Sequence, residues 1–326
     1  MTRFLVKRLI NMVPLILGIT FLSFLVMSLA PGNFLTNLRL NPAISPQVIR
    51  QLEAQFGLDQ PLLVRYAKWL WQVLHLNLGL SMSYRVSVTS LIAARAFNTM
   101  ILAVSSMIFS WAIAIPIGIV VAIRQNSMWD RVLSFVAFFG MSVPNFFLAF
   151  LMMYLALRTG WFPVGATFSP YYQSLDAWGR VADRINHLIL PVLVLGVAGM
   201  ASLMRLMRSQ ILEIKHSEFV RTARAKGLSE RAVIYKHVLR NALNPFVTLA
   251  GYGLADLLGG AALIEAVMNL QGLGLLLLDA VRSLDIYLVM GSVLMGTVLL
   301  LIGNLLADIA LVMVDPRVDF SSLGGP

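Results

Sequence analysis

The sequence predicts an all-α integral membrane protein with six transmembrane helices, and two observations carry this prediction. The first is composition, because 59% of the 326 residues are hydrophobic, only 12% are charged and the mean hydropathy is +0.81. Water-soluble domains are about half apolar and a quarter charged. The second is a series of long intervals without Asp, Glu, Lys or Arg, most of which hold the roughly 20 residues that a helix needs to cross a membrane.

The intervals define the predicted spans. Five of them are free of charge over the length that a span needs, whereas the fifth along the chain is a span only with Asp256 inside it. The first interval also resembles a signal peptide, but it exceeds the roughly 7 to 15 apolar residues of such a leader, so we expect a retained span. The predicted spans are about 9–30, 98–123, 132–157, 187–207, 244–265 and 286–311.

Topology explains most of the net charge of +10. If the N-terminus is cytoplasmic, the short loops on that side carry most of the Lys and Arg residues, as the positive-inside rule requires. We therefore expect both termini in the cytoplasm and no nucleic-acid partner. The chain has no cysteine, which excludes disulfides, thiolate metal sites and thiol nucleophiles.

A small extracytoplasmic helical subdomain is expected between the first two spans, over residues 31–95. Its first helix is predicted from Ser45, a good N-cap, to just before Gly57, a residue suited to end a helix. A second helix is predicted to start at Pro61, with a recurring apolar face.

The second to fifth predicted spans each carry a proline within them or at their start, namely Pro116, Pro144, Pro191 and Pro245. These residues are either ordinary for membrane helices, in which neighbours satisfy the freed backbone groups, or they kink the bundle and create a cavity. Periodicity alone favours the first interpretation.

Residues 208–243, here called the basic loop, connect the fourth and fifth predicted spans. A short helix is predicted over 217–226, ended by Gly227, and Ser229 is predicted to cap a second helix. Phe219, Val220 and Ala223 are expected on one side of the first helix. By composition the loop either lies on anionic headgroups or docks on another subunit.

The basic loop carries a family resemblance. Its segment Phe219-Val-Arg-Thr-Ala-Arg-Ala-Lys-Gly-Leu228 resembles the EAA loop of permease subunits of ATP-binding-cassette (ABC) importers, and most closely the branch that imports dipeptides, oligopeptides and nickel. It departs from the general consensus at Arg221, where the family has Glu, and the last external turn departs at Gln271 and Leu275. Other segments that match the peptide-permease pattern are Pro31-Gly32, Gly57-Leu-Asp-Gln-Pro61, Asn77-Leu-Gly79 with Ser81, Ile115-Pro-Ile-Gly118, Ser142-Val-Pro144, Leu188-Ile-Leu-Pro191, Gly272-Leu-Gly274 and Asp315-Pro316-Arg317.

The resemblance implies the type I ABC importer transmembrane fold in a multi-pass protein of the bacterial inner membrane. Residues 1–95 would hold the first span and the subdomain, 96–314 the transmembrane core and 315–326 a cytoplasmic tail. The implied partners are a homologous second permease in a heterodimer, two cytoplasmic ABC ATPase subunits, an external solute-binding protein and membrane lipid. ATP and Mg would be bound by the ATPase subunits and no cofactor by this chain, which lacks a phosphate-binding Gly-x4-Gly-Lys-Ser/Thr segment.

The candidate coupling residues follow from this resemblance, whereas Asp256 is singled out by its position within the fifth predicted span. We expect no catalytic residue and no metal site, because the four histidines are scattered along the chain. Asp256, with Tyr252 and Ser142, is a candidate for the translocation path, although Asp256 fits a structural hydrogen bond equally well. The expected ATPase-coupling residues are Glu218, Phe219, Val220, Arg221, Thr222, Ala223, Arg224, Ala225, Lys226, Gly227 and Leu228.

Alternatives remain open for the function. Within the same importer class, nickel or glutathione could replace peptide as the substrate. A protein of another class, an ATP-independent secondary transporter, would need ionisable residues on several spans, and this chain has essentially Asp256 and Asp308. A membrane enzyme is disfavoured because no acid, base and nucleophile cluster in the sequence.

Overall fold

The computed structural model describes residues 2–39, 43–246, 249 and 261–314. These residues are mainly helical, and within them the β-structure is limited to an isolated bridge between Leu80 and Ser87. The chain divides into two compact units: the first contains residues 1–99 and 271–301, and the second contains residues 100–270 and 302–326. The division predicted from the sequence, at residue 95, stays a prediction.

The first unit is built from helices at both ends of the chain. Two of its members, α5 and α14, continue into the second unit. Its elements are α1 (Thr2–Leu29), α2 (Leu35–Arg39), α3 (Pro46–Gln55), α4 (Leu62–Leu74), the beginning of α5 (Val88–Ile123), α13 (Leu273–Arg282) and most of α14 (Ile286–Val314).

Helix α3 has the predicted ends. The Ser45 hydroxyl accepts a hydrogen bond from the Val48 backbone N–H, and Pro46 occupies the first turn. Beyond the helix, Gly57 has a φ of +65°, a conformation that favours glycine. These contacts are local in sequence, which is why the residue types alone predict them.

Aromatic packing joins α4 to α1. Trp69 is 1% exposed, and its neighbour Tyr66 hydrogen-bonds through its hydroxyl to the Thr20 hydroxyl at 2.9 Å. Phe24 of α1 packs against Tyr66 with a centroid distance of 5.5 Å. The buried face of α4 therefore includes Tyr66 and Trp69, and the Tyr66 hydroxyl also satisfies the buried hydroxyl of Thr20 in α1.

A buried carboxylate fixes the start of α14. Asp285 is fully buried and accepts hydrogen bonds from the Leu288 backbone N–H at 3.2 Å, as an N-cap, and from the Ser81 hydroxyl at 2.6 Å. Nearby, Gly79 has a φ of +94°, and a Cβ there would lie 3.4 Å from the Tyr287 ring. The Asn77-Leu-Gly79 and Ser81 pattern therefore forms a turn that docks on the start of α14.

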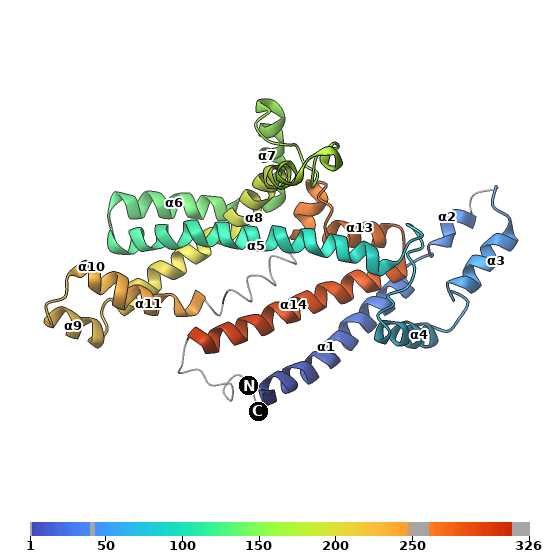
Figure 1. Ribbon diagram of the computed structural model, residues 1–326, viewed down its shortest axis with the longest axis horizontal. Coiled ribbons are helices and arrows are strands. Elements are labelled where there is room, and N and C mark those ends of the chain that lie inside the picture. Colours follow the sequence, from blue (N-terminus) through green and yellow to red (C-terminus); the bar gives the residue numbers. More distant parts are fainter. Residues whose placement is uncertain (1, 40–42, 247–248, 250–260, 315–326) are drawn as a thin grey trace. The chain divides into compact units, whose positions relative to one another are not determined.

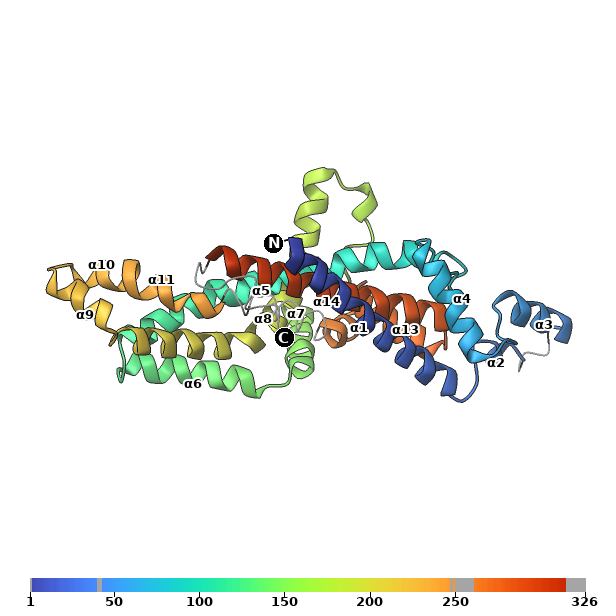
Figure 2. The ribbon, with the colours of Figure 1, turned by 90° about the horizontal axis from the view of Figure 1, so that it is seen from below.

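The second unit contains the remaining helices. In Figures 1 and 2, α9, α10 and α11 lie together where α8 ends. Its elements are the remainder of α5, α6 (Met128–Ser142), α7 (Asn145–Thr159), the 3₁₀ turn η1 (Tyr172–Ser174), α8 (Ala177–Ile214), α9 (Glu218–Ala225), α10 (Glu230–Ala232), the π-helical turn η2 (Val233–Val238), α11 (Leu239–Ala242), a helix over 261–267 and the end of α14.

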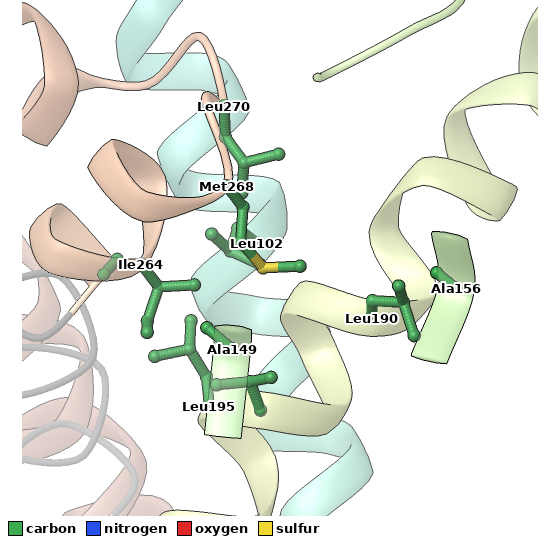
Figure 3. Packing of buried hydrophobic residues seen from close by; sticks show 10 residues of the cluster. Leu102, Ala149, Ala156, Leu190, Leu195, Ile264, Met268 and Leu270 are labelled. Carbon is green, nitrogen blue, oxygen red and sulfur yellow. The ribbon is translucent and has the colours of Figure 1, made fainter. Parts of the chain in front are cut away.

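An apolar core joins four parts of the second unit (Figure 3). Leu102 of α5 and Leu195 of α8 meet Ile264 and Met268, which come from the helix at 261–267 and the residue that follows it. Ala149 of α7 is fully buried in the same cluster, where a small side chain lets helix backbones approach closely. These four segments are far apart in sequence. The residues that join them are all apolar, so dispersion contacts hold them together.

Apolar helices of spanning length confirm a multi-pass membrane protein. Among the described residues, four single helices are long and apolar enough to cross a membrane, and α6 with α7 make a bent apolar pair, which is either one broken span or a re-entrant loop. The fifth predicted span, 244–265, falls largely outside the described residues, so the predicted total of six stays a prediction. The qualifying single helices are Val6–Leu29, Val88–Ile123, Ala177–Ile214 and Ile286–Leu306.

Proline has two different effects here. Pro116 and Pro191 lie inside the continuous helices α5 and α8, as the first interpretation predicts. At Pro144 that interpretation is wrong, because α6 and α7 meet at an angle of 99°. Val143 is extended, with a φ of −86° and a ψ of 123°, the backbone region that a following proline favours.

Candidate functional site

The basic loop begins with α9, an eight-residue helix whose C-terminus is built around glycine. The Gly227 N–H donates to the Arg224 carbonyl at 2.9 Å, and the Leu228 N–H donates to the Ala223 carbonyl at 3.4 Å. These two bonds define a Schellman motif, which needs a left-handed residue between them. Gly227 has a φ of +79°, as predicted, and an added Cβ would meet no atom within 4 Å. The requirement for glycine is therefore conformational and not steric.

The second helical segment starts one residue after this turn. The Ser229 hydroxyl accepts a hydrogen bond from the Ala232 N–H, and Glu230 lies in the first turn, both as predicted. The helix then continues through the π-helical turn η2 into α11. A π-turn adds one residue to the helical repeat and shifts the register of the side chains that follow. Val233 and Val238 are nevertheless both fully buried.

One face of the basic loop packs on the membrane helices of the second unit. Val220 is fully buried, and Ala223 is 5% exposed, in a cluster that includes Ala122 of α5 and Met207 of α8. Phe219, predicted on the same side, is 47% exposed instead. Successive helix residues are rotated by about 100°, and the packing leaves Phe219 outside the buried face. Helix α9 is therefore attached through its apolar face to the ends of α5 and α8.

Arg224 joins three segments of this region. Its guanidinium donates to both carboxylate oxygens of Glu230, at 2.8 and 3.0 Å, and to the Lys215 carbonyl at 3.4 Å. The hydrogen bonds from Arg224 hold the pKa of Glu230 below its usual value, so this contact is complete at neutral pH and is lost as the pH falls through that pKa. Because the side chains are 34% and 54% exposed, the pair fixes geometry more than it adds stability.

The opposite face of α9 is open to solvent. Glu218 and Arg221 form an exposed i,i+3 ion pair at 2.9 Å, and Phe219 lies beside them in sequence with about half of its side chain exposed. Further along, Leu228 is 42% and Tyr235 is 54% exposed. A mixed surface of aromatic, aliphatic and basic groups on a rigid helix is typical of protein docking sites. The other exposed residues of the segment are Thr222, Ala225, Lys226 and Gly227.

An ion pair connects the start of α6 to α8. Asp130 is 6% exposed and accepts hydrogen bonds from the Arg208 guanidinium at 3.1 Å and from the Asn126 backbone N–H at 2.9 Å. Ser127 caps the same helix by accepting from the Asp130 N–H. The turn between α5 and α6 is therefore fixed to the part of α8 that leads into the basic loop. This pair could not be predicted from sequence, because Asp130 and Arg208 are far apart in the chain.

The candidate path residues are not brought together by the described structure. Ser142 ends α6 at the bend, and its hydroxyl donates to the Phe138 carbonyl at 2.9 Å. Asp256 and Tyr252 lie outside the described residues, so their assignment stays a prediction. In the described ranges, no three His, Cys, Asp or Glu residues come together as a potential metal site.

The described groups of the second unit thus include a surface suited to docking. A multi-pass helical bundle holds a rigid helix by its apolar face and exposes a mixed basic face beyond the ends of α5 and α8. This arrangement defines a membrane protein that can contact another protein through the basic loop.

The chain belongs to the family of binding-protein-dependent transport system inner membrane components. That family model matches residues 114–320, and the corresponding N-terminal model matches residues 1–103. The permease resemblance predicted from the sequence is therefore confirmed. Among its relatives is the oligopeptide transport system permease protein AppB of Bacillus subtilis, 38% identical over 98% of this chain and 100% of the relative. Another is the dipeptide transport system permease protein DppB of Escherichia coli K12, 35% identical over 98% and 99%.

A solved structure supports the fold. A chain from the inward-facing conformations of the MetNI methionine ABC transporter superposes with a TM-score of 0.52, at 19% sequence identity. The match covers 69% of this chain and 96% of the other. At this identity the similarity concerns the fold alone, and it agrees with the importer fold that the sequence predicts.

Proposed function

We propose that this chain is a permease subunit of an ATP-driven importer that moves di- or oligopeptides from a solute-binding protein into the cytoplasm. The observation that carries the proposal is the similarity to oligopeptide and dipeptide permeases over 98% of the chain. Nickel and glutathione are alternative substrates within the same class. The chain by itself is not an enzyme in this proposal, and ATP with Mg²⁺ binds to the partner ATPases.

The coupling step would use the basic loop. In the proposal, residues 218–227 occupy a groove on an ATPase subunit, with the exposed face of α9 as the contact surface. Closure of the ATPase dimer around ATP would displace α9, and the buried contacts of Val220 and Ala223 would transmit this displacement to α5 and α8. The spans would then reorient from inward-facing to outward-facing, and hydrolysis would reset them. Arg224 would keep α9 fixed to the following helix during this motion.

The proposed assembly contains several proteins besides this chain. A homologous second permease completes a heterodimer, two ATPases bind on the cytoplasmic side, and a solute-binding protein delivers substrate from outside. The family description, which names binding-protein-dependent transport, supports the last of these partners. The rest of the assembly follows from the importer class.

Transport measurements test the proposal directly. The complete complex in liposomes is expected to accumulate radiolabelled dipeptide or oligopeptide only with ATP, the solute-binding protein and this chain all present. A complex prepared without this chain is the control and should be inactive. Competition by unlabelled peptide, Ni²⁺ and glutathione identifies the substrate. If this chain alone moved peptide down an ion gradient, the secondary-transporter alternative would replace the importer proposal.

Orientation in the membrane is a separate expected result. Both termini are proposed to be cytoplasmic, which places the turn at Asn126 and the loop residue Ala225 inside, and Gln60 and Ser174 outside. The Asp130–Arg208 ion pair supports placing the first two positions on one side, because it joins the turn after α5 to the end of α8. Reporter fusions at these four positions measure the orientation. An external signal at Ala225 would contradict the proposed coupling role of the basic loop.

A further inference from the structure

A cavity of about 140 Å³ lies in the first unit, where two membrane helices end. Ser28 comes from the last turn of α1, and Arg65 comes from α4. The loop residue Asn33 completes the polar wall, while Phe34, Leu284 and Ile286 line the apolar side. All of these residues belong to one compact unit, so the cavity is built within a single packed structure.

The polar wall has donors without acceptors. In the part of the chain that the structure describes, the Arg65 Nε and the Ser28 Oγ are both buried and lack a hydrogen-bond partner. No carboxylate of the described residues lies within ion-pair distance of Arg65, whose guanidinium instead lies 5.4 Å from the centre of the Phe24 ring. Burial lowers the pKa of Arg65, but a guanidinium stays charged at neutral pH. A half-buried cation without a counter-ion, in the wall of a cavity, favours an anionic ligand.

Size limits what the ligand can be. The cavity is smaller than the roughly 300 to 1,000 Å³ of sites that enclose a drug-sized ligand, and a peptide is therefore excluded from it. It exceeds the roughly 10 to 15 Å³ of such space that a single water molecule needs. One tetrahedral or planar oxyanion group fits the volume of the cavity, balances the charge of Arg65 and accepts hydrogen bonds from the polar wall.

Position indicates the source of this group. Ser28 lies near the end of the apolar helix Val6–Leu29, and Ile286 begins the apolar helix Ile286–Leu306. The ends of membrane-spanning helices lie at the depth of the lipid phosphates, where arginine side chains commonly end. The apolar residues that line the cavity give a surface for the glycerol and the first acyl carbons.

We propose that this cavity binds the phosphate of one phospholipid molecule, with Arg65 as the counter-ion and Ser28 as a hydrogen-bond donor. The bound lipid joins the end of α1 to α4 and to the start of α14. It acts as a structural ligand of the first unit.

Native mass spectrometry of the full-length chain tests the proposal. The chain is purified from nanodiscs that contain phosphatidylglycerol, or from nanodiscs of a phosphate-free galactolipid. Unchanged protein is expected to retain one phosphatidylglycerol through detergent washing, and no galactolipid. Arg65→Gln should reduce this retention roughly tenfold or more, because it removes a charge-assisted bond. Arg65→Lys should reduce it less, and Arg158→Gln, at an exposed arginine near the end of α7, should leave it unchanged.

A second measurement removes the ambiguity of a misfolded variant. Phosphatidylglycerol titrated into delipidated, unchanged protein is expected to raise its unfolding temperature, whereas galactolipid should not. Ser28→Ala should weaken this response without changing charge. Equal retention by unchanged protein and Arg65→Gln, or equal stabilisation by both lipids, overturns the proposal.

Discussion

Replacing Gly227 by valine is expected to abolish coupling between ATP hydrolysis and transport while the chain still inserts into the membrane. The left-handed conformation costs an ordinary L-residue about 1 to 2 kcal/mol, and a β-branched residue more. Because 1.4 kcal/mol is a factor of ten, the intact helix end becomes roughly tenfold less populated or worse. Substrate-stimulated ATPase activity and peptide uptake of the assembled complex are the measurements.

The control for this substitution uses the same position. Asparagine tolerates the left-handed conformation better than other non-glycine residues, so Gly227→Asn should retain much of the coupling. No atom lies within 4 Å of the added Cβ, so the Cβ that both variants share meets no steric obstacle. Normal stimulated ATPase activity in Gly227→Val would contradict the role assigned to the Schellman turn.

Replacing Gly118 by alanine is expected to destabilise the second unit and to weaken coupling with it. The new Cβ would lie 2.7 Å from the Met207 Cβ and 2.9 Å from the Met204 carbonyl oxygen. Neither atom is the end of a flexible side chain, so α5 and α8 must separate, at a typical cost of about 1 to 3 kcal/mol. The change lies one residue from Ile119, which belongs to the cluster beneath α9. Thermal unfolding in detergent measures the loss.

Gly199→Ala is the matched control. Gly199 also lies in a membrane helix, α8, but a Cβ there meets no atom within 4 Å. Alanine is more favourable than glycine inside a helix, by up to about 1 kcal/mol, so this variant should be as stable as the unchanged protein or more stable. Both substitutions replace glycine by alanine, but Gly118→Ala is expected to lower the unfolding temperature and Gly199→Ala to keep or raise it. Equal unfolding temperatures for both variants would show that the α5–α8 contact does not limit stability.

Locally determined features were predictable from the sequence. The ends of α3 and α9 depend on Ser45, Gly57 and Gly227, whose capping roles follow from their own side chains and backbone freedom. The apolar membrane helices follow from composition and length. Which residues of α9 are buried could not be predicted from the sequence. The neighbouring helices decide whether Phe219, at the edge of the apolar face, is buried.

Features that depend on contacts between distant residues were not predictable. Pro116, Pro144 and Pro191 give the same local signal, yet only Pro144 marks a sharp bend. There α7 leaves the direction of α6 and buries Ala149 and Ala156 in the core of the second unit. The Asp130–Arg208 and Arg224–Glu230 pairs likewise need two helices to be placed before either partner can be identified.

The length of α8 has a mechanical consequence. Its 38 residues extend about 57 Å as an uninterrupted helix, nearly twice the thickness of a hydrocarbon core of about 30 Å. A rod of this length that pivots by about 10° at its middle moves its two ends about 5 Å in opposite directions. One end carries the residue that caps the helix, Asp176, and the other carries α9 in its packed cluster. A small rotation of α8 about its middle therefore moves its two ends in opposite directions. A displacement of α9 is accompanied by an opposite displacement of the end at Asp176.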